Sequence, residues 1–102
     1  MLEKFEVVLP GGQVRTCAVS RVCDVPQEFW TAIADEVGLP GLPYAVGVGH
    51  NWAKCKFGSH EHQFVTDYEI TLSRAVELGP NNWDYTQNLI QLSARATVDY
   101  SD

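Results

Sequence analysis

The residues best suited to chemistry lie in one short stretch, HNWAKCKFGSHEH, at positions 50–62. It contains all three histidines of the chain and one of its three cysteines. Thiolate and imidazole are ligands that zinc prefers, and a catalytic zinc has three protein ligands and an open fourth position. The stretch therefore offers a candidate zinc site made by Cys55, His60 and His62.

Such a site depends on how the flanking elements place these side chains. Alternating residues and a turn at Gly58-Ser59 predict strands at 52–57 and 60–65. His60 and His62 are two residues apart, so they share one face of a strand. His50 would lie about 16 Å from the other three across five residues of strand, which excludes a four-ligand site. The expected register places Cys55 opposite His62, Lys56 opposite Glu61 and Ala53 opposite Phe64.

Two other interpretations of these side chains stay open. Cys55 and His62 could form a nucleophile–base pair, but such a pair needs a third orienting group, and the sequence shows none. The simpler interpretation, which we favour, is structural. Cys55 is then a small buried hydrophobe, and the histidines are polar ends of a strand.

The first part of the chain predicts a β-hairpin followed by a helix. Gly11-Gly12 forms a two-residue turn that places Leu9 opposite Val14, so that alternate residues face the core. A helix is expected at about 25–37, with Asp24 as its N-cap and Gly38 as its C′ residue. Its apolar face repeats at helical spacing and consists of Phe29, Trp30, Ile33 and Val37.

The second part predicts a strand, a helix and a final strand. A strand is expected at 43–48. Residues 66–78 alternate like a strand, but Thr66 and Glu69 fit a capping box and Gly79-Pro80 fits a helix end, so we expect a helix there. From Ile90 to the C-terminus strict alternation predicts a strand with one buried face.

These elements predict an α+β domain covering residues 1–102. An antiparallel sheet of four to six strands would have two helices on one face, in the order β-β-α-β-β-(β)-α-β. The last six elements approximate the split β-α-β, ferredoxin-like arrangement, with the first strand as an addition. This fold has many functions and decides nothing about activity.

Composition and charge exclude several classes of function. No run of about 18 apolar residues exists, so the sequence predicts no membrane span. The start MLEKFEVVLP has no apolar signal region, and an odd number of cysteines without a CxxC pair fits a reduced, cytoplasmic protein. Net charge is −6, with −1 in residues 1–60 and −5 in residues 61–102. Direct nucleic-acid binding is not expected, because it requires clustered lysine and arginine.

A small acidic chain without a catalytic motif predicts a non-enzymatic module that binds a partner protein with a basic surface. Phages and other mobile elements use such chains as inhibitors that cover nucleic-acid-binding surfaces of host defence proteins, so an anti-defence role is one form of this hypothesis. Residues 80–88, PNNWDYTQN, are the expected contact loop, although Trp83 could instead cover an open end of the core. A homo-oligomeric assembly stays open, since edge strands pair with copies of themselves. The expected contact residues are Asp67, Glu69, Glu77, Trp83, Asp84 and Tyr85.

Overall fold

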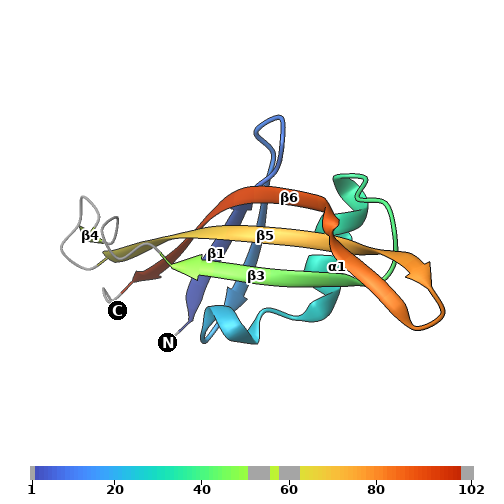
Figure 1. Ribbon diagram of the computed structural model, residues 1–102. Helices are drawn as coiled ribbons and strands as arrows, with labels where there is room; N and C mark the ends of the chain where they lie inside the picture. Colours follow the sequence, from blue (N-terminus) through green and yellow to red (C-terminus); the bar gives the residue numbers. More distant parts are fainter. Residues whose placement is uncertain (1, 51–55, 58–62, 100–102) are drawn as a thin grey trace.

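The structure, a computed structural model, describes residues 2–50, 56–57 and 63–99. The described strands form one antiparallel sheet in the order β2-β1-β6-β5-β3, and the short strand β4 also pairs with β5. Among these described residues one α-helix occurs, and it lies against one face of this sheet (Figure 1). The elements are β1 (Glu3–Val8), β2 (Val14–Val19), the 3-10 turn η1 (Val22–Asp24), α1 (Gln27–Glu36), β3 (Tyr44–His50), β4 (Lys56–Phe57), β5 (Gln63–Gly79) and β6 (Asn82–Asp99).

The first hairpin is confirmed, but its predicted register is wrong by one residue. Gly12 N–H donates to Leu9 C=O and Leu9 N–H donates to Gln13 C=O, so the loop has three residues, not two. Gly11 and Gly12 both have positive φ, as a turn requires. A shift of one residue exchanges the two faces of a strand. Phe5 therefore pairs with Cys17, and the side of β2 that faces the helix carries Arg15, Cys17 and Val19.

The predicted helix is confirmed, with a later start. Asp24 lies in η1 and forms an ion pair with Arg21, and Pro26 takes the N-cap position of α1. The C-terminal end is as expected, because Gly38 has a φ of 72°. Gly38 N–H bonds to Asp35 C=O and Leu39 N–H to Ala34 C=O, which is a Schellman motif.

The second predicted helix, at 66–78, is wrong. These residues belong to β5, which pairs with β6 along one edge and with β3 along the other. Their alternation carried the correct signal, since Ile70 and Leu72 are fully buried while Glu69 is exposed. The fold is therefore an α+β arrangement that is mostly antiparallel sheet, with one α-helix among the described residues, and the predicted split β-α-β order does not hold.

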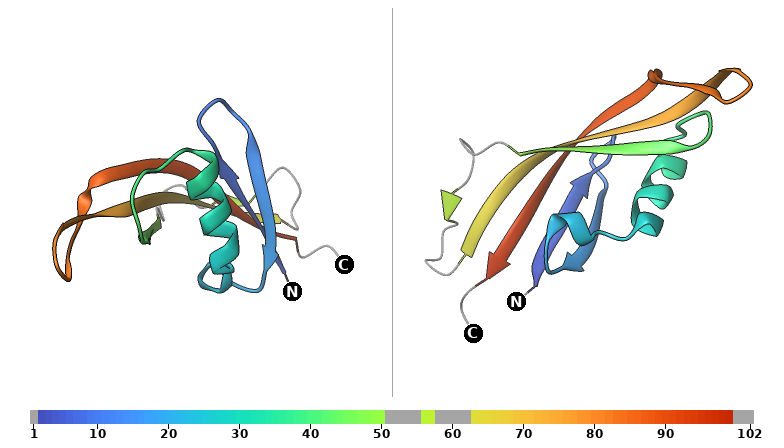
Figure 2. Two further views of the ribbon diagram at one scale, coloured as in Figure 1. Left: turned by 90° about the vertical axis from the view of Figure 1, so that its right-hand side faces the viewer. Right: turned by 60° about the horizontal axis from the view of Figure 1, so that its bottom comes forward.

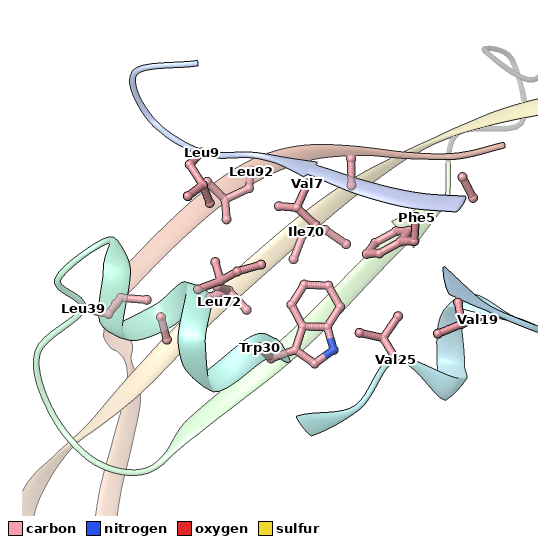
Figure 3. Close-up of a cluster of buried hydrophobic side chains, with 14 residues drawn as sticks. Phe5, Val7, Leu9, Val19, Val25, Trp30, Leu39, Ile70, Leu72 and Leu92 are labelled. Carbon is pink, nitrogen blue, oxygen red and sulfur yellow. The ribbon is translucent and has the colours of Figure 1, made fainter. Parts of the chain in front are cut away.

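The core fills the space between α1 and the covered face of the sheet (Figure 3). Phe5 of β1 is fully buried and contacts Trp30 of α1 in an edge-to-face arrangement with ring centroids 5.8 Å apart. Trp30 and Ile33 are buried, and Phe29 and Val37 pack beside them, as the helical spacing predicted. The final strand also holds as predicted, with Leu92, Ala94, Ala96 and Val98 buried on one face. Two arginines connect the same face of the sheet to α1, through the ion pairs Arg15–Glu36 and Arg74–Asp35.

The opposite face of the sheet bears no helix in the described part of the chain (Figure 2). Its exposed side chains include Val8 and Val14, which are 39% and 42% exposed. None of the described helices is both long enough and apolar enough to cross a membrane.

Candidate partner-binding site

The most prominent surface feature is the far end of the β5–β6 hairpin. β5 and β6 have 17 and 18 residues, whereas β1 and β3 have 6 and 7. The last pair of β3 with β5 is Tyr44–Arg74, and β1 ends opposite Ser93 of β6. Residues 76–88, which we call the arm, therefore extend past the neighbouring strands as a two-stranded ribbon (Figure 1).

A tight turn at Pro80-Asn81 closes the arm. Proline followed by a residue with positive φ is typical of a type II turn, and Asn81 has a φ of 59°. Gly79 and Asn82 form the last pair of the ribbon. Residues 80–88 are therefore not the loop that the sequence predicted, since only Pro80 and Asn81 lie outside the strands. The Gly79-Pro80 signal marks a hairpin turn here and not a helix end.

Trp83 lies on the ribbon opposite Glu77. Directly opposed residues in an antiparallel pair project from the same face, so the indole and the carboxylate are neighbours. Trp83 is 42% exposed and does not belong to the core cluster, which rules out the alternative that it covers the open end of the core. Tyr85, two residues on, is 39% exposed.

Asp84 has a role within the arm that the sequence did not indicate. Its Oδ1 accepts hydrogen bonds from Thr86 N at 2.8 Å and from the Thr86 hydroxyl, and its Oδ2 accepts one from Gln87 Nε2 at 2.8 Å. These bonds lower the pKa of Asp84, because they favour its charged form. The register between β5 and β6 shifts at this place. Asp84 thus shapes a β-bulge, and its carboxylate is already engaged by its own chain.

The arm and its base carry a concentration of exposed apolar side chains. Leu78 is 58% exposed on the arm, while Leu89 and Leu42, at 54% and 69%, lie at its base. Five of the nine large exposed hydrophobics among the described residues lie here: Leu42, Leu78, Trp83, Tyr85 and Leu89. Apolar residues gathered on one exposed element are typical of an interaction surface. The sequence analysis did not identify the three leucines, because nothing in their spacing shows that β5 and β6 extend past the sheet.

The predicted contact residues Asp67 and Glu69 lie elsewhere. Both are on the face of the sheet without a helix, where Asp67 pairs with Arg95 and Glu69 with Ser93. Eight residues of strand separate Glu69 from Glu77, a distance of roughly 26 Å. The six predicted residues therefore divide into two groups, and only Glu77, Trp83, Asp84 and Tyr85 lie together on the arm.

The alternative metal site cannot be placed, because Cys55, His60 and His62 lie outside the described residues. The strand pairing that supported it differs from the prediction, since Lys56 lies opposite Val65 and not opposite Glu61. Within residues 2–50, 56–57 and 63–99, no group of three or more histidine, cysteine or acidic side chains is arranged to hold a metal.

Comparisons with known proteins give no relative from which a function could be inferred. No family model, no curated protein and no solved structure matches the chain.

Proposed function

We propose that this chain is a non-enzymatic module that binds a partner protein through the arm, and that the partner presents a basic surface. The observation that carries the proposal is the arm itself, an exposed ribbon with Trp83 and Tyr85 on it. Tryptophan and tyrosine are among the residue types that contribute most to binding at protein interfaces. We expect the partner to be a protein and not a nucleic acid, because the sequence has no cluster of lysine and arginine.

The sign of the free charge supports a basic partner. Of the described bases, Lys4, Arg15, Arg21 and Arg74 each form an ion pair with an acid of the same chain. Among the side chains that the structure describes, the charges outside such pairs are one arginine, Arg95, against six acids: Glu3, Glu28, Asp67, Glu69, Glu77 and Asp84. The described charges left for a partner are therefore mostly negative.

The arm combines this negative charge with aromatic rings. Residues 75–94 contain no lysine or arginine and two acids, Glu77 and Asp84. An arginine or lysine of the partner could then stack on the Trp83 ring and lie beside the Glu77 carboxylate, which combines a cation–π contact with an ion pair.

Basic protein surfaces commonly bind nucleic acid. We infer that the chain acts as an inhibitor that covers such a nucleic-acid-binding surface on its partner. This is the role expected of a phage-encoded anti-defence protein. Free thiols at Cys17 and Cys23 fit a reducing compartment, which supports the cytoplasm as the place of action.

The test starts by capturing the partner and continues with measured affinities. A photo-crosslinking residue at Tyr85 should link the chain to one host protein, which is then purified. Trp83→Ala should weaken binding of that protein by about 30-fold, or about 2 kcal/mol. Val14→Ala is the matched control, because Val14 is also 42% exposed but lies on the strand at the far edge of the sheet. It should change the affinity by less than about threefold.

Charge is tested by titrating salt. Wild-type affinity should fall between low and high ionic strength, and Glu77→Lys should reduce that dependence. Asp24→Lys changes the net charge equally but lies in η1, so it should leave most of the dependence in place. Equal losses for Trp83→Ala and Val14→Ala, or an affinity indifferent to salt, would rule out binding by the arm to a basic surface.

A further inference from the structure

Strand β3 is an unprotected edge of the sheet. It pairs with β5 on one side, and in the described part of the chain no strand lies on its other side. Its sequence, YAVGVGH, contains no proline and no lysine, arginine or acid. Edge strands are usually protected by charges, prolines or bulges, because their free backbone groups pair readily with another strand. β3 has none of these, and its register with β5 is unbroken from Tyr44 to His50.

The hydrogen bonds at the start of β3 show which backbone groups are free. Pro43 C=O accepts a bond from Ala75 N–H at 2.8 Å, so it faces β5. Backbone groups of successive residues in a strand point to opposite sides. The N–H and C=O groups of Tyr44, Val46 and Val48 therefore point away from β5, toward the open edge.

A pocket lies beside this edge, between the first turn of α1 and the start of β3. Its volume is about 300 Å³, enough for an apolar side chain. One wall is fixed, because the Tyr44 hydroxyl bonds at 2.8 Å both to Thr31 Oγ1 and to Gln27 C=O. A strand added to β3 would project alternate side chains toward this face of the sheet. The pocket is lined by Val25, Gln27, Trp30, Tyr44 and Val46.

The charges next to the edge select the occupant. Glu28 on α1 and Glu69 on β5 are exposed, and neither forms an ion pair among the described residues. The nearby base Arg74 is already paired with Asp35. Two copies of the chain joined edge to edge would carry these acids on both sides of the junction, with no unpaired described base beside them, so charge would not favour that pairing. A segment that carries lysine or arginine would instead meet opposite charge.

We propose that the outer edge of β3 is a second binding site, which takes up an extended, basic segment of a partner protein as an added strand. Backbone bonds to Tyr44, Val46 and Val48 would provide affinity, and an apolar side chain in the pocket would provide specificity. The proposal does not depend on the arm, which begins beyond the Tyr44–Arg74 pair and contributes no residue to this edge.

Amide hydrogen exchange on the whole chain tests this directly. The probe is a ten-residue synthetic peptide in which valine alternates with lysine, and the control peptide has glutamate in place of each lysine. The lysine peptide should slow exchange at Val46 and Val48 by about tenfold or more, because their N–H groups become bonded. Amides of Thr16 and Ala18 on the opposite edge should not change. Equal protection by the glutamate peptide, or none by the lysine peptide, would overturn the proposal.

Edge prolines separate strand addition from other kinds of binding. Val48→Pro removes an outward N–H at a side chain that is 48% exposed, so the pairing with β5 should persist. Thr16→Pro is the matched control. The Gln13 C=O accepts a bond from Leu9 N–H, so Gln13 faces β1, and alternation along β2 then turns the Thr16 N–H outward.

Val48→Pro should weaken binding of the lysine peptide by about tenfold, and Thr16→Pro by less than about twofold. Far-UV circular dichroism checks that both variants fold. If Val48→Pro does not fold, Val48→Lys, which keeps the backbone N–H, is used in its place. That substitution adds a positive charge, so it too should weaken the peptide. If the Val46 amide is protected from exchange in the absence of peptide, and this protection increases with protein concentration, a second copy of the chain occupies the edge instead. Trp83→Ala should leave peptide binding unchanged, so failure here and failure at the arm are distinguishable.

Discussion

Gly41 is the position where a single methyl group should be most damaging. Its φ is 95°, and a Cβ built there would overlap the Ala75 carbonyl oxygen and lie 3.3 Å from the Ala75 carbonyl carbon. Both atoms are backbone of β5, so they cannot move as a flexible side chain would. The Gly41→Ala variant must therefore displace the segment that carries Leu42 and Pro43.

The expected loss follows from three contributions. An L-residue at this φ costs about 1–2 kcal/mol. Relief of the overlap costs about 1–3 kcal/mol, in line with overpacked sites. The displaced segment also weakens the bonds between Leu42 N and Ala75 O, at 3.1 Å, and between Ala75 N and Pro43 O, at 2.8 Å. Each contributes about 1 kcal/mol, but they are not lost in full. We expect Gly41→Ala to lower the free energy of unfolding by about 3–5 kcal/mol.

Gly38→Ala is the control for this prediction. Gly38 has a φ of 72°, but a Cβ there would meet nothing within 4 Å. The variant should lose only the conformational part, about 1 kcal/mol. Urea unfolding of both variants measures the difference between their free energies of unfolding, provided that the slope of this free energy against urea concentration is unchanged. Equal losses would show that the close approach of Gly41 to β5 is not a constraint, and the reasoning would fail.

Three further predictions concern single side chains. Trp30→Ala should lower the free energy of unfolding by about 3–5 kcal/mol, and Trp83→Ala by about 1 kcal/mol or less, both measured by urea unfolding. Because the pKa of Asp84 is lowered, its contribution to stability is present above the ordinary aspartate pKa and is lost as pH falls through the lower folded value. Thermal midpoints of Asp84→Ala should therefore depend less on pH in the acid range than those of wild type. Burial raises the pKa of Glu3, whose Oε2 has no partner among the described residues, so the charged form opposes folding. Glu3→Gln should raise the thermal midpoint at pH 7, and the gain should vanish once pH falls below the ordinary glutamate pKa, where both states are protonated.

Elements defined by local signals were predictable from the sequence. The end of α1 follows from Gly38, because few other residues adopt the backbone conformation that a Schellman motif needs. The buried face of β6 follows from strict alternation between Ile90 and Val98. The first hairpin was predicted except for one residue in its loop. Pro10-Gly11 and Gly11-Gly12 are both acceptable turn centres, and only the backbone bonds of Leu9 decide between them.

β5 could not be assigned from local signals, because two of them conflict. Thr66 and Glu69 match a capping box and Gly79-Pro80 matches a helix end, although Tyr68, Ile70 and Leu72 alternate as in a strand. Pairing decided the outcome. β5 bonds to β6 over almost its whole length and to β3 on its other side, contacts between residues distant in sequence that no local pattern reports. The position of the arm could not be predicted either, because it also depends on pairing between residues distant in sequence.

Charge counted from the sequence also overstated the charge available to a partner. Residues 61–102 carry a formal charge of −5, but some of these acids already interact with other residues of the chain. Asp84 is bonded within the arm, and Asp67 lies opposite Arg95. Arg74, one of the two bases of this half, has the opposite effect: it is neutralised by Asp35 from the other half, so it does not offset the remaining acids.

The proposed preference for a basic partner therefore depends on a few acids that have no competing bond among the described residues, above all Glu69 and Glu77. These two lie roughly 26 Å apart, too far for one small contact. Glu77 belongs to the arm and Glu69 lies next to the open edge of β3. The same acidic composition thus supports two separate surfaces, each with its own apolar anchor. Loss of one should weaken a partner that spans both without abolishing its binding, since linked contacts contribute through effective concentration.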